Sequence, residues 1–429
     1  MRTEALAAIA VLTLTLLSTL ALAASPPSLA SRTVAYLPYP QGLQTQPPSN
    51  IPVLLPLPPY GILLLFVGSS GSYLAMFNIS NRDYKVIAHF GLNIVPNPSL
   101  TAPMLCLSNI SNGTVTVTNY VAEVSPEGSI SEEPLINGSY LLCTGLAEAD
   151  GVIVASLLNF SATSSEVVVA RQVGRSLEIM KSMSLPPGGM LVDLSPSPSG
   201  LLYGAYLEFP SFPSSIFSTS KVYTIYPVYV NLSSGSLTVL NRFNMTYTLS
   251  SNESLWLDSS TVSSSLIIYG GVYVSVSPNL PYSTFSVQPI LIYFNTSTYR
   301  LLNVSDLMPP ASGVFGAYWS PWGILISDAK LAWGSRNISY SPYLFLKPWG
   351  EPWGGGLVNE TGLAPGQLVL EGLEVKGSYY LVAVNITGQK VAIIEVYKKG
   401  LSWAYVIVPI AVIAVVIVAV SLAVLLRRR

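Results

Sequence analysis

The sequence predicts an all-β protein built from short strands. From about residue 60 onward, apolar or alternating runs such as GILLLFVG (61–68) and VAIIEVY (391–397) are separated by Gly, Pro, Asn and Ser. Val, Ile, Tyr and Thr dominate these runs, and β-branched and aromatic residues of this kind are typical of strands. The stretch SSEVVVARQVGRSLEIMKSM (164–183) is long enough for a helix, but its Val-rich start and central Gly-Arg favour two strands. We therefore expect no long helix between the two ends of the chain.

A weak internal repeat predicts how these strands are grouped. The segment 191–209 aligns with 256–276, so that Asp193 matches Asp258 and the Tyr-Gly pair at 203–204 matches the pair at 269–270. A strand–Asn–turn–strand phrase recurs at five places, namely around Asn78, Asn159, Asn231, Asn295 and Asn385. The aligned units start near residues 61, 104, 140, 201, 266, 323 and 367.

Units of roughly 40–50 residues that hold about four short strands are typical of β-propellers. We therefore predict a β-propeller of about seven blades. Two tandem β-sandwiches are the alternative, because they also consist of short strands joined by Gly- and Pro-containing turns.

The N-terminal end predicts export. Residues 1–24 combine Arg2, an apolar run and Ala21-Leu22-Ala23. This is the pattern of a cleavable signal peptide, with an uncleaved N-terminal anchor as the alternative. Residues 25–59 are rich in Pro and Ser, and we expect an extended lead-in there rather than a folded element. Residues 60–402 are then the all-β extracytoplasmic domain.

The C-terminal end predicts one transmembrane helix. Residues 403–426 contain an uncharged apolar stretch that is long enough to span a bilayer. Trp403 lies on one side of it, and three arginines at 427–429 follow on the other, in agreement with a cytoplasmic tail. We therefore expect a single-pass type I protein of the cell membrane, with the bulk of the chain outside the cytoplasm.

The exported part is rich in potential N-glycosylation sites. Hydroxyl-rich composition alone is the alternative explanation for their number. The thirteen N-x-S/T sequons lie at Asn78, Asn109, Asn112, Asn137, Asn159, Asn231, Asn244, Asn252, Asn295, Asn303, Asn337, Asn359 and Asn385.

The two cysteines, Cys106 and Cys143, are expected to form a disulfide because both lie on the exported side. Two buried free thiols are the alternative. In the propeller register the two residues occupy equivalent places in neighbouring units. A disulfide would then tie adjacent blades, provided that the Cα atoms approach within about 7 Å.

The phrase L-V-D-L-S-P at 191–196, followed by Leu201 and Tyr203, resembles the inner-strand phrase of secreted propeller repeats of the surface-layer and YVTN type. Those families usually carry Pro-Asp-Gly in the turn, whereas this chain has Pro-Ser-Gly at 198–200. The resemblance covers the middle of the exported part best. It implies a sequon-rich, membrane-anchored surface protein similar to those of archaea.

Three Pro-Trp-Gly phrases, at 321–323, 348–350 and 352–354, are the most distinctive local feature. Pro and Gly favour tight turns, so these loops can present aromatic rings that bind a sugar or a partner protein. Rings that fill the blade interior or the loop bases are the alternative. The predicted binding residues are Trp319, Trp322, Trp333, Trp349 and Trp353.

A catalytic interpretation depends on Asp193 and Asp258, which occupy matching places in two repeats. Paired carboxylates that share a proton can act in acid catalysis. The exported, anchored and sequon-rich layout also resembles thermopsin-like archaeal acid peptidases, although no motif of that family can be transferred. The alternative role of each Asp is to cap a turn. We keep an extracytoplasmic acid hydrolase, a peptidase or a glycosidase, as the second functional hypothesis.

The composition excludes several classes of function. Only 10% of the residues are charged and the net charge is -1, so there is no basic stripe for nucleic acid. One histidine and two cysteines are too few for a Cys/His zinc site, and no phosphate-binding loop is present. We expect no cofactor and no metal.

The most favoured function is therefore a non-catalytic binding, adhesion or envelope-structural role at the cell surface. Its partners would be the membrane and a surface glycan or protein. Because few carboxylates are available for protonation, the chain also suits hot or acidic surroundings, such as the surface of a thermophilic archaeon.

Overall fold

The computed structural model describes the chain from Leu29 to Lys398, apart from short internal stretches at 44–51, 60, 100, 112–115, 140, 160–163, 175, 186–188, 198–200, 209–219, 241, 251, 264–265, 278–283, 334–337, 351–357, 360–365 and 386–389. Ser31–Glu395 form one compact unit. The expected signal peptide (1–24) and membrane helix (403–426) lie outside the described residues. Within the described part of the chain, no helix is long and apolar enough to cross a membrane.

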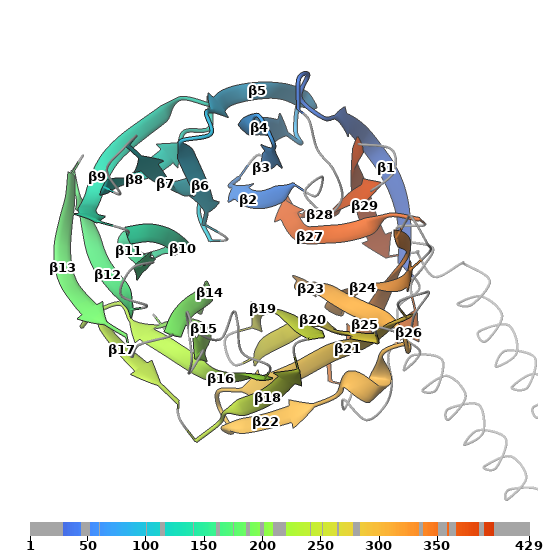
Figure 1. Ribbon diagram of the computed structural model, residues 1–429. Helices are drawn as coiled ribbons and strands as arrows, with labels where there is room; N and C mark the ends of the chain where they lie inside the picture. The colour runs from blue at the N-terminus through green and yellow to red at the C-terminus, as the bar shows by residue number, and fades with distance from the viewer. Residues whose placement is uncertain are drawn as a thin grey trace, which may run out of the picture. The chain divides into compact units, whose positions relative to one another are not determined.

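The unit is a seven-bladed β-propeller, in which seven antiparallel sheets are arranged in a ring (Figure 1). Six sheets have four strands and one has five, and we number them blade 1 to blade 7 in chain order. This confirms the prediction of an all-β propeller with about seven blades over the sandwich alternative. The described helical structure is one short 3-10 turn, η2 (Ser305–Leu307).

The strands follow one another from blade to blade. Blade 1 consists of β2 (Val53–Leu57), β3 (Gly61–Gly68), β4 (Gly71–Asn78) and β5 (Asp83–Phe90), and blade 2 of β6 (Ile94–Pro98), β7 (Met104–Ile110), β8 (Thr116–Val124) and β9 (Ile130–Ser139). Blade 3 consists of β10 (Leu141–Ala149), β11 (Val152–Asn159), β12 (Ser164–Val173) and β13 (Ser176–Ser184), and blade 4 of β14 (Gly189–Ser197), β15 (Leu201–Glu208), β16 (Ser220–Asn231), β17 (Ser236–Val239) and β18 (Met245–Ser250).

The same order continues in the last three blades. Blade 5 consists of β19 (Glu253–Ser263), β20 (Leu266–Ser277), β21 (Thr284–Asn295) and β22 (Arg300–Asn303), and blade 6 of β23 (Ser312–Ser320), β24 (Gly323–Trp333), β25 (Ile338–Pro348) and β26 (Val358–Asn359). Blade 7 consists of β27 (Leu368–Val375), β28 (Ser378–Asn385), β29 (Lys390–Lys398) and β1 (Leu29–Pro38).

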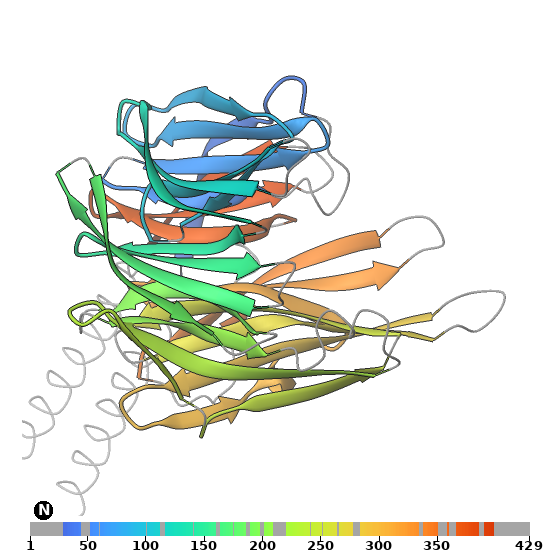
Figure 2. The ribbon, with the colours of Figure 1, turned by 60° about the vertical axis from the view of Figure 1, so that its left-hand side comes forward.

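The first strand of each blade lies nearest the centre of the ring, where it contacts the first strands of both neighbouring blades (Figure 1). Because consecutive strands are antiparallel, the first-to-second and third-to-fourth turns lie at one end of each blade, which we call rim A. The second-to-third turns lie at the other end, rim B. Figure 2 shows the β20–β21 hairpin (yellow) and the β24–β25 hairpin (orange) projecting at rim B.

The ring is closed by a strand from the other end of the chain. β1 lies at the outer edge of blade 7, where it is hydrogen-bonded to β29. Arg32 on β1 donates from Nε to Glu395 Oε2 on β29 at 2.7 Å. The Pro-rich stretch 25–59 therefore differs from the expected lead-in, because it supplies β1 and also β2, the first strand of blade 1.

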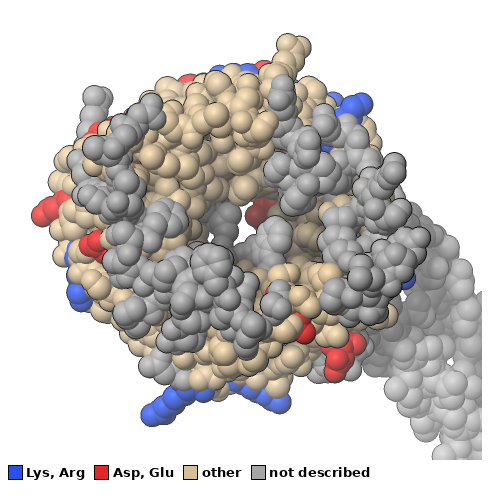
Figure 3. All heavy atoms as spheres, viewed as in Figure 1, with Lys and Arg blue, Asp and Glu red and all other residues tan. Residues whose placement is uncertain are grey.

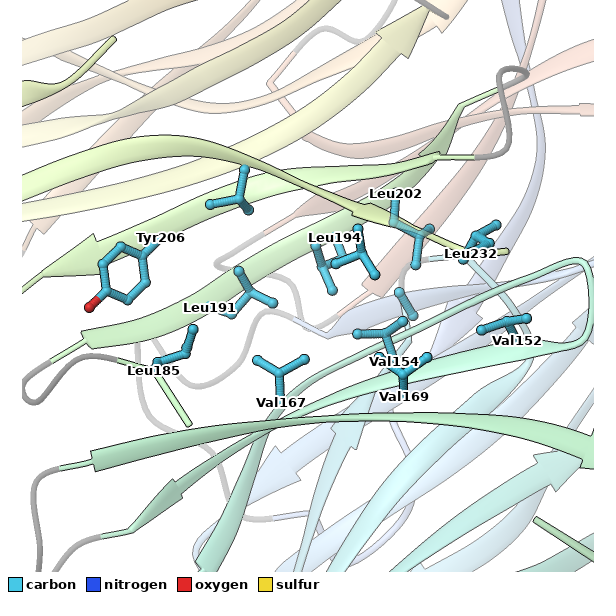
Figure 4. Close-up of a cluster of buried hydrophobic side chains, with 13 residues drawn as sticks. Val152, Val154, Val167, Val169, Leu185, Leu191, Leu194, Leu202, Tyr206 and Leu232 are labelled. Atoms are coloured by element: carbon cyan, nitrogen blue, oxygen red, sulfur yellow. The ribbon is translucent and has the colours of Figure 1, made fainter. Parts of the chain in front are cut away.

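Each pair of neighbouring blades encloses its own cluster of buried apolar side chains. Between blades 3 and 4, Val154, Val167 and Val169 face Leu191 and Leu202 (Figure 4). Equivalent clusters lie at the six other blade interfaces. A middle strand of a blade is therefore buried on both faces, which explains why its sequence is a continuous apolar run rather than an alternating one.

Cys106 and Cys143 form the predicted disulfide, with their Cα atoms 6.2 Å apart, and it ties blade 2 to blade 3. Their places in the two blades are not equivalent, however, because Cys106 lies on the second strand β7 and Cys143 on the first strand β10. The sequence units near residues 140 and 367 begin at a first strand, whereas the other five begin at a second strand. This difference in starting point made the predicted equivalence wrong.

Replacing both cysteines by alanine (C106A/C143A) is expected to destabilise the fold. The bridge closes a loop with a sequence separation of 37, so its loss should lower the free energy of unfolding by about 3–4 kcal/mol through the entropy of the unfolded chain. The measurement is the urea midpoint of the variant and of the wild type, with wild type under reducing conditions as a second reference. An unchanged midpoint would contradict the prediction.

Candidate functional site

Two of the three Pro-Trp-Gly phrases come together at rim A of blade 6. Trp322 lies in the turn from β23 to β24, and Trp349 follows the end of β25. The chain passes close to itself here, because a Cβ added at Gly323 would meet the carbonyl oxygen of Lys347. Glycine is therefore required at the end of the first phrase, and the two loops are held side by side, with the Trp349 amide donating to the Trp322 carbonyl at 3.4 Å.

The buried residue Ser320 fixes both loops. Its hydroxyl donates to the Gly323 carbonyl at 2.7 Å and accepts from the Gly323 amide at 3.2 Å. Its own carbonyl accepts a hydrogen bond from Trp349 Nε1 at 2.9 Å. Because this indole N–H is used inside the protein, the exposed part of Trp349, which is 41% exposed, is mainly the apolar ring.

Tyr379 on β28 of blade 7 supports the other two rings. It contacts Trp319 and Trp322 edge-on, with ring centroids 6.3 Å and 5.6 Å away, and its hydroxyl donates to the Trp319 carbonyl. Burial, and then the charge of Glu371, raise the pKa of Tyr379 well above its usual value, so the hydroxyl remains a donor. Trp319 itself is 42% exposed. We call Trp319, Trp322 and Trp349 the tryptophan patch.

The patch lies beside the interface between blades 6 and 7, which is held partly by tyrosine hydrogen bonds. Tyr318 of blade 6 donates to the Val369 carbonyl of blade 7 at 3.1 Å, and Tyr379 donates in the opposite direction. Among the described residues, the fully buried apolar cluster at this interface contains only Ala329, Leu368 and Val384. Aromatic side chains therefore supply much of the contact at the point where two tryptophans reach solvent.

The structure does not bring all five predicted tryptophans together. Trp333 is the last residue of β24, where it pairs with Ile338. It therefore lies at rim B, at the opposite end of the strand from Trp322. Trp353 lies outside the described residues. The candidate binding surface is thus restricted to the tryptophan patch.

Asp193 and Asp258 lie on the first strands of the adjacent blades 4 and 5, and these strands, β14 and β19, contact each other. Asp258 pairs with Gly270, and Asp193 lies in a bulge across from Gly204. Tyr269 connects the same two blades by donating to the Gly204 carbonyl at 3.4 Å. The two aspartates therefore occupy matching backbone positions, while their side chains lie outside the described part of the structure.

The side chains of several sequon asparagines accept hydrogen bonds within hairpin turns. The Oδ1 atoms of Asn78, Asn231 and Asn295 accept hydrogen bonds from the backbone amide two residues further on, at 2.9, 3.0 and 3.0 Å. Such Asx turns stabilise the reversal of the chain. None of the sequon asparagines with a described side chain is buried. Of the others, Asn112 and Asn337 lie outside the described residues, and the side chains of Asn137 and Asn359 are not described.

Sequence reasoning missed a buried carboxyl in blade 6. Asp328 on β24 is fully buried, and among the described residues neither of its carboxyl oxygens has a partner that meets hydrogen-bond geometry. Burial raises the pKa of Asp328 to about 7, and the nearby Ser312 hydroxyl and Ala329 amide offset only part of this rise. The Ser312 hydroxyl donates instead to the Pro309 carbonyl at 2.7 Å. Nothing in the local sequence distinguishes this residue from an exposed aspartate.

Within the described residues, no group of three or more His, Cys, Asp or Glu side chains is placed to hold a metal ion. The tryptophan patch itself contains no titratable side chain. Its chemistry is therefore that of an apolar contact surface with fixed ring positions.

No protein-family model and no curated protein matches the sequence. Solved structures resemble it in fold. Hydrazine synthase of Kuenenia stuttgartiensis is 11% identical with a TM-score of 0.48, and the match covers 85% of this chain and 100% of that chain. The β-propeller domain of the Trilobed protease from Pyrococcus furiosus is 9% identical with a TM-score of 0.42, over 79% and 93% of the two chains.

An oligogalacturonate lyase in complex with manganese is 8% identical, with a TM-score of 0.40 over 87% of this chain and 98% of that chain. The similar structures also include the Mitotic Checkpoint Complex. At these identities the likeness concerns the fold alone.

The variant D328N is expected to change how stability depends on pH. The folded protein keeps the Asp328 proton up to about pH 7, whereas the unfolded chain loses it near pH 4. The contribution of this group is therefore fully present below about pH 4 and is lost as the pH rises through 7, by about 4 kcal/mol for a shift of about three pKa units. The folding stability of D328N should not fall in this way as the pH rises.

The measurement is urea unfolding of wild type and D328N at pH 4, 6 and 8. The exposed carboxyl of Asp306 offers a matched control, D306N, which should keep the wild-type pH dependence. Equal pH slopes for D328N and wild type would contradict the prediction.

Proposed function

We propose that this chain is a non-catalytic recognition protein of the cell surface and that the tryptophan patch binds a glycan. The observation that carries the proposal is the exposure of Trp319, near the end of β23, and of Trp349, in the loop after β25, by 42% and 41%, at positions that are fixed by hydrogen bonds inside the protein. Preorganised aromatic rings lose little conformational entropy on binding. Their apolar faces match the C–H faces of sugar rings, and the patch carries no charge that would have to be desolvated.

The location of the protein outside the cell, anchored in the membrane, is part of this proposal. The signal-like segment 1–24 and the apolar segment 403–426 support export and a single membrane span, which would hold the propeller outside the cell. The sequons support a glycosylated exported chain. The sequence resemblance to secreted propeller repeats supports the same setting, that of a membrane-anchored archaeal surface protein.

The double variant W319A/W349A is expected to weaken glycan binding by about tenfold or more, because truncation of central aromatic anchors commonly costs 2 kcal/mol or more. The measurement is a screen of the wild-type protein on immobilised glycans, followed by titration of each ligand found. The matched control is Y36A, since Tyr36 is 60% exposed but lies on β1 in blade 7.

Two results would contradict the proposal. One is binding that both variants retain equally. The other is a wild-type protein that binds no glycan but captures a protein partner through the same rings.

The second candidate function is an extracytoplasmic acid hydrolase, either a thermopsin-like peptidase or a glycosidase. The observation that favours it is the matching position of Asp193 and Asp258 on the contacting first strands β14 and β19. Both residues lie on adjacent inner strands, and two carboxylates that come close together can share a proton.

Under this alternative, D193A and D258A, which create no new sequon, should each lower the rate of peptide or glycoside hydrolysis at pH 3–4 by about a hundredfold or more, as expected for loss of a general acid or base. The measurement is hydrolysis of a denatured protein and of aryl glycosides by wild type and both variants. A wild-type protein without activity, or variants with full activity, would remove this alternative. D306N provides the carboxyl control.

A further inference from the structure

A second candidate site lies where the ring closes, between blade 7 and blade 1. A pocket of about 310 Å³ opens there at rim A. Its charged lining residues are Arg32, Arg82, Lys376 and Glu395, which are three cations and one carboxylate. In a chain with 20 basic and 21 acidic residues, this is a local concentration of positive charge. On the opposite face of the ring, at rim B, the charged atoms visible in Figure 3 lie mainly around the outer edge.

The wall from blade 1 presents Arg82. The β4–β5 turn is capped by Asn78, whose Oδ1 accepts from the Ser80 amide at 2.9 Å, and Ile79 and Ser80 line the pocket. Arg82 ends this turn with φ at 60°, a left-handed conformation that non-glycine residues seldom adopt. Among the described residues, the Arg82 guanidinium makes no hydrogen bond or ion pair that would neutralise it.

The wall from blade 7 presents Lys376. Lys376 and Gly377 form the two-residue turn between β27 and β28, with φ at 51° and 77°. Positive φ at both central residues is the pattern of a type I′ hairpin. Directly after the turn, Ser378 and Tyr380 on β28 also line the pocket and add two hydroxyl groups. Both cations are therefore held on short, well-defined turns.

The remaining side is formed by the strands that close the ring. The Arg32 and Glu395 side chains are paired at 2.6 Å, with relative exposures of 67% and 17%. Beyond this internally neutral pair, the charged residues that line the pocket are Arg82 and Lys376. Val34, Ile79 and Val375 supply an apolar surface beside these charges.

We propose that this pocket binds a small organic acid, whose carboxylate or phosphate group contacts Arg82 and Lys376. Guanidinium and ammonium groups form charge-assisted hydrogen bonds with both kinds of oxyanion. The volume lies at the lower end of the range for ligand pockets, which suits a body of about one sugar ring against the apolar surface. The proposal is independent of the tryptophan patch, since no residue of that patch lines the pocket.

The test uses calorimetric titration of the full-length protein with glucuronate, glucose 6-phosphate, inorganic phosphate and glucose. We expect binding of one or both sugar acids, with weaker binding at higher ionic strength. The two sugar acids distinguish a carboxylate from a phosphate ligand. Tight binding of glucose would overturn the requirement for an anion, and equal affinity for inorganic phosphate and glucose 6-phosphate would overturn the role of the apolar surface.

The variants R82N and K376G each remove one charge while keeping the turn. Asparagine and glycine tolerate positive φ, and K376G gives Gly-Gly, which is favoured in type I′ turns and creates no new sequon. Each variant is expected to weaken sugar-acid binding about tenfold without lowering the thermal midpoint of the free protein. The control is R242N, because Arg242 is exposed on the loop between β17 and β18, outside the pocket.

E395Q provides a test with the opposite sign. It removes the only carboxylate among the described residues that line the pocket and breaks the ion pair with Arg32. The affinity for the sugar acids should therefore rise several-fold. Unchanged affinity in R82N and K376G, or weaker binding in E395Q, would overturn the proposal. Absence of binding by the wild type to every probe would overturn it as well.

Discussion

Every blade of this protein depends on having a neighbour on each side, and this condition is met only if the ring closes. A four-stranded sheet with two apolar faces cannot be stable alone in water, because both faces would be exposed. Each of the seven interfaces buries its own apolar cluster, from Leu55 and Leu105 between blades 1 and 2 to Leu37 and Ile62 between blades 7 and 1. β1, from near the start of the chain, completes blade 7 and contributes Leu37 to the last of these interfaces.

The need of each blade for a neighbour on both sides explains which strands can be predicted from the sequence. Middle strands such as β3 (Gly61–Gly68) are buried on both faces, so their sequences are continuous apolar runs, and such runs predict strands. First strands have one edge without a hydrogen-bonded partner, and proline is tolerated on such edges. Pro56 in β2, Pro96 in β6 and Pro196 in β14 all lie on first strands. Within 25–59, Pro56 lies in β2 and Pro38 ends β1, so proline content does not exclude strands there. The sequence has no signal for the pairing of β1 with β29.

The candidate sites also differ in whether the sequence alone predicts them. The tryptophan patch could be predicted because Pro, Trp and Gly are adjacent in sequence, although only the structure shows that Tyr379 of the next blade supports the rings. The pocket could not be predicted, because Arg32, Arg82 and Lys376 come from three distant segments that meet only in the closed ring. The raised pKa of Asp328 could not be predicted for a related reason, since it is caused by burial between blades rather than by the neighbours of Asp328 in sequence.

The two candidate sites share one element of blade 7. Successive residues of a strand point to opposite faces of the sheet. At the start of β28, Tyr379 turns towards blade 6 and the tryptophan patch, while Ser378 and Tyr380 turn towards blade 1 and the pocket. One short hairpin therefore contributes to an apolar aromatic surface on one side and a cationic pocket on the other, both at rim A. Because β27 and β28 are fixed between two neighbouring blades, a substitution that shifts this hairpin should affect both sites, whereas a change in a side chain on one face should affect only one.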